Sequence, residues 1–194
     1  ISFEHIYIYD ITENKLEKIA ENGKDYYRYS PLIIVPESNK FYFLDTKNIY
    51  EYDLSTKRIK TVYCGNQVIN DACIDKKGNF WLASEGGLIH YNPVSQKSHT
   101  IHTTLFNETT SIIADNQDRV WIGTRQNLYV YSAAENNIII LDETNGIGTN
   151  EYISRSHLLL PNGDIIMGGF SGIAYINSDI HFETKTKYKI ELDR

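Results

Sequence analysis

The sequence predicts an all-β protein, a β-propeller built of four-stranded antiparallel blades, and three observations support this fold. First, the chain holds 27 Ile and 15 Tyr against 13 Leu and 7 Ala, so residues that suit a pleated sheet outnumber good helix formers. Second, apolar residues recur at every second position in short runs bounded by turn residues. Third, these runs repeat about every 40 residues, the spacing of Trp81 and Trp121 and the length of a propeller blade.

Each repeat contains an aromatic or apolar anchor strand followed by a second alternating strand. The anchors are residues 40–45, 79–84, 119–124 and 164–169, and the strands that follow them are 48–53, 87–92, 127–132 and 172–177. A further copy of the second strand, residues 5–10, has no anchor before it. One strand before each anchor and one after the second strand complete a blade of four.

The strand count gives about four and a half blades. We expect a partial blade at 1–25 and complete blades at 26–66, 67–106, 107–147 and 148–182, with residues 183–194 as a last outer strand or a lead into another domain. The partial blade contains only third and fourth strands, and the C-terminus supplies no first and second strands to complete it. We therefore expect the C-terminal part of a larger propeller, with earlier blades upstream of Ile1, in preference to a closed four-bladed ring.

Turn residues agree with this blade pattern. Gly78, Gly163, Gly87 and Gly172 stand where a hairpin needs positive φ, and the third complete blade has Asp118 and Asn127 at those points. Asp and Asn tolerate the left-handed region best among the other residues, so both are expected to adopt it. One repeat position carries a tyrosine in four copies, which we expect to pack between adjacent blades: Tyr9, Tyr52, Tyr91 and Tyr131.

The anchor segments resemble a known repeat family. Residues 75–91 read Asp-x-x-Gly-x-Phe-Trp-Leu-Ala-Ser-x-x-Gly-Leu-x-x-Tyr, and residues 115–131 match again with Asp118 and Asn127 in place of glycine. This pattern is similar to the two-component regulator propeller repeat. Residues 150–152 with the glycines at 163, 168, 169 and 172 look like the final blade of that family, with Ile166 where Trp is expected. The first complete blade departs most from the pattern.

The resemblance implies the periplasmic sensor of a Bacteroidetes-type hybrid two-component system. In that family two propellers and an immunoglobulin-like domain precede a membrane helix and a histidine kinase, and the sensor detects carbohydrates or their breakdown products. The resemblance therefore implies an extracytoplasmic ligand-sensing propeller, not an enzyme in this segment, that signals to a cytoplasmic kinase. Residues 183–194 could then lead into the immunoglobulin-like domain.

Composition and spacing exclude several other classes. The net charge is −6, from 19 basic and 25 acidic residues, and basic residues are scattered, so we expect no nucleic-acid partner and no membrane contact in this segment. Two cysteines, Cys64 and Cys73, cannot form a four-ligand zinc site. His99 and His102 point to opposite faces of a predicted strand. We expect no metal, no cofactor and no catalytic residues, whereas open sheet edges make a homodimer plausible.

A ligand site can be placed from the repeat register. Aligning the inner strands on residues 78, 118 and 163 brings polar side chains into one ring at the channel, in two successive registers: Asn70, Thr110 and Arg155, then Asp71, Ser111 and Ser156. The facing loops add Glu85, Arg125, Gln126, Asn150 and Tyr152. Arginine and tyrosine beside amides suit a sugar acid or sulfated glycan. The candidate ligand-binding residues are Asn70, Thr110, Arg125, Asn150, Tyr152 and Arg155.

Two other functions stay open at this point. The propeller could be an interaction scaffold that presents a face or an edge to another protein. It could also be a fragment of a glycoside hydrolase or lyase, in which loop carboxylates such as Glu85 and Glu151 would act.

Overall fold

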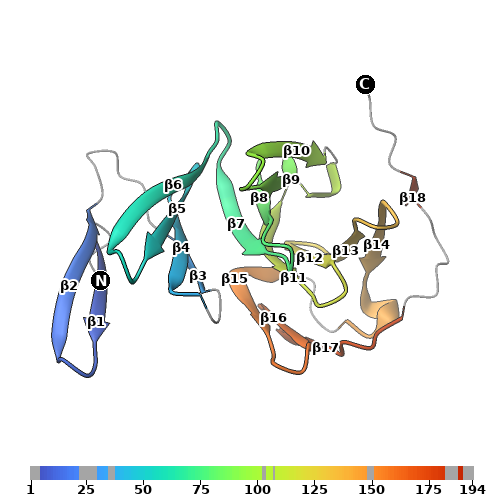
Figure 1. Ribbon diagram of the computed structural model, residues 1–194. Coiled ribbons are helices and arrows are strands. Elements are labelled where there is room, and N and C mark those ends of the chain that lie inside the picture. The colour runs from blue at the N-terminus through green and yellow to red at the C-terminus, as the bar shows by residue number, and fades with distance from the viewer. Residues whose placement is uncertain are drawn as a thin grey trace. The chain divides into compact units, whose positions relative to one another are not determined.

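The structure is a computed structural model that describes residues 5–21, 30–34, 38–101, 104–106, 108–147, 151–181 and 188–189. The chain divides into two compact units, Ile1–Ile69 and Asn70–Arg194, and each is described by itself. Figure 1 shows that both consist of antiparallel sheets joined by tight turns. Among the described residues, no helix has the length and apolar character needed to cross a membrane. The predicted fold class, an all-β propeller type with four-stranded blades, is confirmed.

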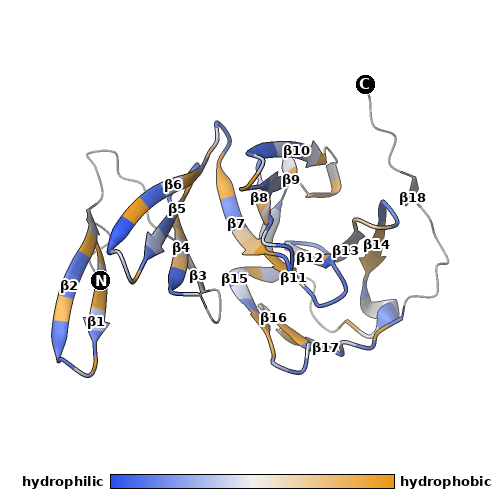
Figure 2. Cartoon of the chain, in the orientation of Figure 1, coloured by the Kyte–Doolittle hydropathy of each residue, from blue (hydrophilic) through white to orange (hydrophobic). Residues whose placement is uncertain are grey.

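Unit 1 contains a hairpin and one four-stranded sheet. The hairpin pairs β1 (His5–Asp10) with β2 (Lys15–Glu21), as expected for the partial blade. The sheet has the order β3-β4-β5-β6, with β3 (Ser30–Ile34), β4 (Lys40–Leu44), β5 (Asn48–Asp53) and β6 (Arg58–Cys64). Along its strands hydrophilic and hydrophobic residues alternate, as Figure 2 shows for β6.

Unit 2 contains three blades in succession. The first is β7 (Ile69–Ile74), β8 (Phe80–Ser84), β9 (Gly87–Asn92) and β10 (Lys97–Ile101). The short 3-10 helix η1 (Thr104–Phe106) leads to β11 (Thr109–Ala114), β12 (Arg119–Thr124), β13 (Leu128–Ser132) and β14 (Asn137–Leu141). A second 3-10 turn, η2 (Glu143–Asn145), precedes β15 (Tyr152–Leu159), β16 (Ile165–Gly169) and β17 (Gly172–Ile176). In each blade the strands pair in sequence order, from the first outward.

Each tryptophan is preceded by an aspartate six residues earlier, and the contacts of this aspartate explain the fixed distance between the two residues. In the turn between β11 and β12, Asp115 Oδ1 accepts the backbone N–H groups of Gln117 at 2.8 Å and Arg119 at 2.9 Å, while Oδ2 accepts the Trp121 indole N–H at 2.8 Å. Asp75 makes the same contacts in the preceding blade, including one to the Trp81 indole at 3.2 Å. One carboxylate therefore both closes the hairpin turn and orients the ring that packs between blades.

Positive φ occurs at most of the predicted turn positions. Gly78 and Gly163 have φ of 78° and 91°, and Asp118 adopts 59° in their place. The expectation for Asn127 is wrong, because Asn127 is not one of the described residues that have a positive φ. Instead the Thr124 hydroxyl oxygen accepts the Asn127 backbone N–H at 3.0 Å, and this bond closes a different turn.

A second turn motif was not foreseen. The turn from third to fourth strand begins with a residue whose side-chain oxygen accepts backbone N–H groups two or three positions later; these residues are Asp10, Asp53, Asn92 and Ser132. Four residues after each comes a residue with positive φ: Asn14, Lys57, Gln96 and Asn136. Two local devices per blade thus hold the hairpins in register.

The core of unit 2 lies between its blades. One cluster joins the β7–β10 sheet to the β11–β14 sheet around Trp81, Ile122 and Tyr131. A second joins the β11–β14 sheet to the β15–β17 sheet around Trp121, Leu128 and Met167. The expectation that the repeated tyrosine packs between blades is confirmed for Tyr131, which belongs to the first of these clusters. Tyr52 and Tyr91 are buried, while the expectation is wrong for Tyr9, which is 54% exposed.

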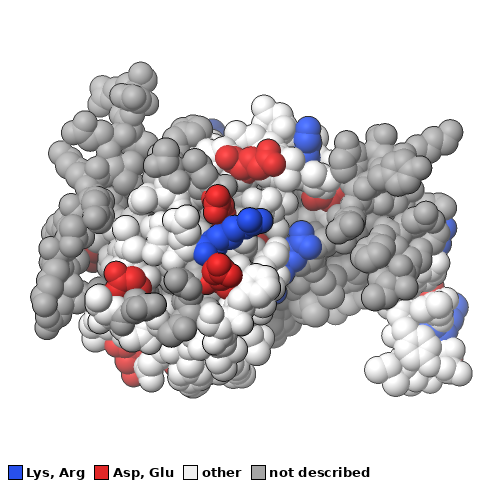
Figure 3. All heavy atoms as spheres, turned by 180° about the vertical axis from the view of Figure 1, so that it is seen from behind, with Lys and Arg blue, Asp and Glu red and all other residues white. Residues whose placement is uncertain are grey.

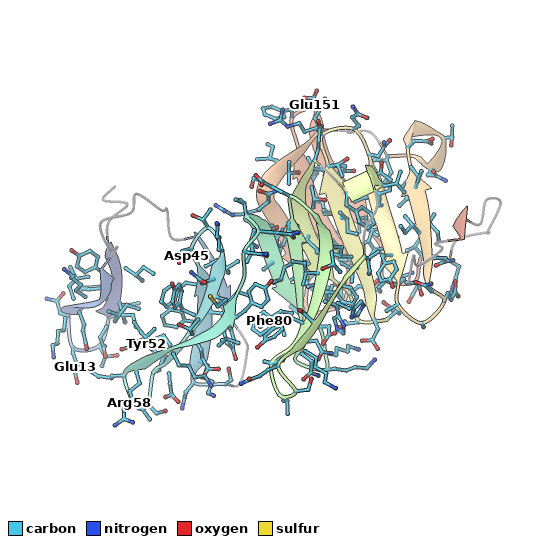
Figure 4. The ribbon with its side chains drawn as sticks, turned by 90° about the horizontal axis from the view of Figure 1, so that it is seen from above. Glu13, Asp45, Tyr52, Arg58, Phe80 and Glu151 are labelled. Atoms are coloured by element: carbon cyan, nitrogen blue, oxygen red, sulfur yellow. The ribbon has the colours of Figure 1, made fainter. Side chains whose placement is uncertain are left out.

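The first complete blade carries polar contacts where the later blades carry tryptophan. Tyr42 occupies the anchor position, and its hydroxyl donates to Glu51 Oε2 at 3.0 Å. The nearly buried Glu51 carboxylate also pairs with Lys40 at 3.1 Å and Lys60 at 3.0 Å. Figure 4 labels Tyr52 and Arg58 in this sheet, where the Tyr52 ring packs 5.2 Å from that of Phe41. This network explains why the blade keeps the fold while departing from the repeat sequence.

The C-terminal strand pairs differently from the expectation of an outer strand for the last blade. β18 (Tyr188–Lys189) lies antiparallel to β14, with Tyr188 opposite Ile138, and extends the preceding sheet to five strands. The last sheet has the order β15-β16-β17, and no fourth strand pairs with it among the described residues. Residues 182–187 and 190–194 lie outside the described part of the chain, so a lead into an immunoglobulin-like domain stays a prediction.

Candidate functional site

The candidate site lies along the first strands of the three blades of unit 2, β7, β11 and β15. These are the innermost strands of their sheets, and β11 packs against β15 (Figure 1). β11 and β15 are interrupted by bulges, between Thr109 and Ser111 and between Tyr152 and His157. A bulge breaks the pairing of a strand and turns side chains in a new direction, and it is often found beside functional sites.

The register Asn70, Thr110 and Arg155 is brought together, as the alignment predicts. The Asn70 amide donates to the Thr109 carbonyl at 3.2 Å, and the Arg155 guanidinium donates to the Asn70 carbonyl at 3.3 Å. The Thr110 hydroxyl lies 3.1 Å from the Gly123 carbonyl and 2.8 Å from the Tyr152 carbonyl. The Thr110 proton is therefore committed to the backbone, whereas Arg155 has further N–H donors.

Arg155 has an unusual backbone. Its φ is 61°, in the left-handed region that a residue with a long side chain seldom adopts. Its side chain is exposed. A strained residue persists when the surrounding structure holds it, and such residues concentrate at ligand sites. Arg155 is the candidate residue best placed to meet a charged ligand.

The other candidate residues are placed differently. Tyr152 is 2% exposed and belongs to the core between the last two blades, so its ring cannot stack on a ligand in this conformation. Its buried hydroxyl has no hydrogen-bond partner in the part of the chain that the structure describes, and burial raises its pKa to about 12. Arg125 is exposed, as are Glu85 and Gln126, while Asn150 lies outside the described residues. Glu151 is also exposed and stands at an outer end of the molecule in Figure 4.

Three polar side chains meet next to this register. Each comes from one of the three inner strands, one or two residues after Asn70, Thr110 or Arg155. The His157 Nδ1 atom lies 2.8 Å from the Ser111 hydroxyl and 3.4 Å from Asp71 Oδ2. Asp71 is fully buried and accepts the Ala72 N–H on its own strand and the Ile112 N–H of β11, both at 2.9 Å. The alignment foresaw Asp71 and Ser111 as neighbours. It aligned Ser156 with them and missed His157, which follows the irregular pairing between Tyr152 and His157 in β15.

Burial controls the protonation of this cluster. It raises the pKa of Asp71 to about 7, against the backbone N–H groups and Arg155, which favour the ionised form. It lowers the pKa of His157 to about 4, so the imidazole is neutral near pH 7. A neutral imidazole and a partly protonated carboxyl can share hydrogen bonds without a fixed buried ion pair.

The cluster does not have the geometry of a nucleophilic triad. A triad needs the serine on one ring nitrogen of the histidine and the carboxylate on the other, so that the proton passes through the ring. Here Ser111 and Asp71 meet the same nitrogen, and both are fully buried. Within the described ranges, no group of three or more His, Cys, Asp or Glu residues is arranged to hold a metal ion.

Two further surface features bear on binding. A cleft of about 640 Å³ lies between β14 and β17 and is lined mainly by apolar side chains, including Trp121, Ile139 and Leu141. On the face shown in Figure 3, acidic and basic side chains are interspersed. The polar inner-strand cluster, with its exposed arginine, is therefore a better match for a hydrophilic ligand than the cleft.

Comparison with known proteins supports the repeat assignment. The family model described as two component regulator propeller matches residues 105–126, which include β11 and β12. Over 73 residues, or 38% of the chain, the sequence is 32% identical to histidine kinase P4 of Formosa agariphila. The chain spans 5% of the length of that relative. The sequence-based resemblance to this repeat is thus confirmed.

Solved structures share the fold. The extracellular domain of the hybrid two component system BT4673 from B. thetaiotaomicron matches 90% of the chain and 25% of its own length, with a TM-score of 0.69 and 20% identity. The corresponding domain of BT3049 from the same organism covers 91% of the chain and 31% of its own, with a TM-score of 0.60 and 17% identity. Virginiamycin B lyase from Staphylococcus aureus covers 96% of the chain and 63% of its own, with a TM-score of 0.70 and 10% identity.

Proposed function

We propose that the chain is a ligand-sensing propeller from the extracytoplasmic, periplasmic part of a hybrid two-component sensor, and that it responds to a carbohydrate-derived ligand and signals to a cytoplasmic histidine kinase. The observation that carries the proposal is the match of residues 105–126 to the two-component regulator propeller repeat. The kinase relative and the fold shared with extracellular sensor domains point the same way.

The proposed contact point is the end of the inner strands around Arg155. Its exposed guanidinium can make charge-assisted, bidentate hydrogen bonds to a carboxylate or sulfate. Asn70, whose amide nitrogen is bound to the Thr109 carbonyl, can still accept a hydrogen bond through its side-chain oxygen. Arg125, also exposed, is a second cation for the same ligand.

Calorimetric titration with oligosaccharides tests the proposal. The panel contains neutral, uronate-bearing and sulfated oligosaccharides, added to the wild-type chain, to Arg155→Gln and to Arg155→Gly. Glycine adopts positive φ freely, so the glycine variant removes the side chain without adding backbone strain. We expect an acidic oligosaccharide to bind and both variants to lose about tenfold or more in affinity, the loss of one charge-assisted hydrogen bond.

Arg58→Gln is the matched control, because Arg58 is exposed on β6 of unit 1 and is expected to have no part in binding. Absence of binding across the whole panel, or equal affinity in all four proteins, would contradict the proposal. Stable dimers without oligosaccharide binding would favour the interaction scaffold instead. Turnover of an oligosaccharide that is lost in Glu151→Gln would favour the hydrolase or lyase function.

A further inference from the structure

His157 presents one ring edge to the protein and the other to the outside. Its Nδ1 faces the Ser111 hydroxyl at 2.8 Å and Asp71 Oδ2 at 3.4 Å, and neither of these two side chains has any exposed surface. The His157 side chain itself is 18% exposed. Since the Nδ1 edge faces two fully buried side chains, we infer that the exposed surface includes the opposite edge, which carries Nε2.

The proton on Asp71 decides which nitrogen of a neutral His157 carries hydrogen. An ionised Asp71 offers only acceptor oxygens, so the ring is most stable with N–H at Nδ1 and a bare Nε2. A protonated Asp71 is a donor, as is Ser111, so Nδ1 then accepts and the hydrogen moves to Nε2. Between the two states the proton on the carboxyl changes, and the ring exchanges one tautomer for the other without gaining charge.

We propose that His157 is a specificity-determining residue of the inner-strand site, whose outward Nε2 accepts a hydrogen bond from a ligand while Asp71 is ionised and donates one while Asp71 is protonated. The ligand clause rests on the proposed function. A bare Nε2 suits a sugar hydroxyl, which can donate. An Nε2–H in the same strand as the Arg155 guanidinium suits a group that only accepts, such as a carboxylate or sulfate.

The surroundings of Asp71, its burial above all, place this change near neutral pH. From β15 it faces His157 and the guanidinium of Arg155, from β11 the Ser111 hydroxyl and the Ile112 N–H, and from its own strand the buried thiol of Cys73. Burial is the largest influence and raises the Asp71 pKa to about 7, while the His157 pKa falls to about 4. The acid form of Asp71 is therefore gained as pH falls through 7, well before the ring becomes cationic.

Nitrogen NMR of the histidine rings tests the proposal without any ligand. In the ¹⁵N-labelled chain, two-bond proton–nitrogen correlations identify the tautomer of each ring. We expect His157 to carry N–H at Nδ1 at about pH 8.5 and at Nε2 at about pH 5.5, with the change centred near 7. His90 and His99 report in the same spectra and serve as internal controls, since neither has Asp71 as a neighbour.

Asp71→Asn is expected to hold His157 in one tautomer across this pH range. Ser111→Ala, which removes a hydroxyl and adds no volume, is the second variant; it is expected to keep the pH-dependent change because Asp71 remains. One tautomer at both pH values in the wild type, an ordinary imidazolium titration near 6.5, or an unchanged transition in Asp71→Asn would each overturn the proposal. Failure of oligosaccharide binding with the tautomer change intact would overturn the proposed function and the ligand clause that rests on it, and would leave the coupling between Asp71 and His157 standing.

Discussion

The last two sheets of unit 2 can be compared at the same repeat positions, on the face that each sheet turns toward the next sheet in sequence. This face is buried in the β11–β14 sheet and largely exposed in the β15–β17 sheet. In the β11–β14 sheet these positions pack against the β15–β17 sheet and are at most 6% exposed: Ile113, Trp121, Leu128 and Val130. In the β15–β17 sheet three of the equivalent residues are 55–68% exposed: Leu158, Ile173 and Tyr175. The equivalence follows from pairing, since Trp121 lies opposite Val130 as Ile166 lies opposite Tyr175.

The difference teaches that burial in this fold is a property of the neighbouring sheet. The strands of both blades alternate in the same way, and both faces are apolar. In a repeat protein each unit packs against its neighbours, and a terminal unit usually has a polar outer face. The β15–β17 face thus has the composition of a blade interface, which fits a further sheet of the same repeat.

The largest expected difference is in the free energy of unfolding, between alanine substitutions at the equivalent residues Leu128 and Ile173. Leu128→Ala should lower the free energy of unfolding by about 2–5 kcal/mol, because it leaves a cavity in a closed interface. Ile173→Ala should change it by about 0.5 kcal/mol or less, because the side chain is largely in water. Urea unfolding of the two variants measures the difference. Equal losses would show that the β17 face is covered in solution, against the structural comparison.

A smaller difference in stability is expected between alanine substitutions at Gly123 and Gly168, which occupy the same repeat position. A Cβ at Gly123 would lie 2.8 Å from Cβ and 2.9 Å from Cγ of the buried Tyr152, which cannot move aside. Gly123→Ala should therefore reduce stability by about 1–3 kcal/mol. At Gly168 the added Cβ meets Ser156, a short side chain on the less covered sheet, so Gly168→Ala should have the smaller effect. Thermal unfolding compares the pair, and a reversed order would contradict the assigned packing.

Per pH unit, the smallest expected effect is a pair of opposed pH dependences within the covered inner strands. The raised pKa of Asp71 stabilises the fold at low pH, and this contribution is lost as pH rises from about 4 to about 7. The lowered pKa of His157 stabilises the fold at neutral pH, and this contribution is lost as pH falls from about 6.5 to about 4. In the wild type the two trends oppose each other over most of this range.

Single substitutions should separate the two trends. His157→Gln should become less stable as pH rises from 4 toward 7, and Asp71→Asn should become less stable as pH falls from 6.5 toward 4, each by about 1 kcal/mol per pH unit at most. Urea unfolding at several pH values measures both slopes relative to the wild type. Parallel slopes in the two variants would contradict the placement of both groups in one buried cluster.

The repeat made much of the fold predictable. The four-stranded blades, the hairpin at the N-terminus and the positive φ at Gly78 and Asp118 all follow from residues close together in sequence. The candidate site was only partly predictable. The register brought Asn70, Thr110 and Arg155 together, but it placed Tyr152 at the ligand and overlooked His157. The bulge in β15 shifts that strand, and nothing in the local sequence marks the shift.

The sequence by itself determined the local units of this protein. Alternation sets which side chains share a face, and each turn is closed by side chains a few residues away, as Asp115 does for Trp121. The tertiary structure alone decided which faces are covered, that β18 joins β14, and that Asp71, Ser111 and His157 meet. Contacts between blades join residues about 40 positions apart, and both burial and pKa depend on those distant neighbours.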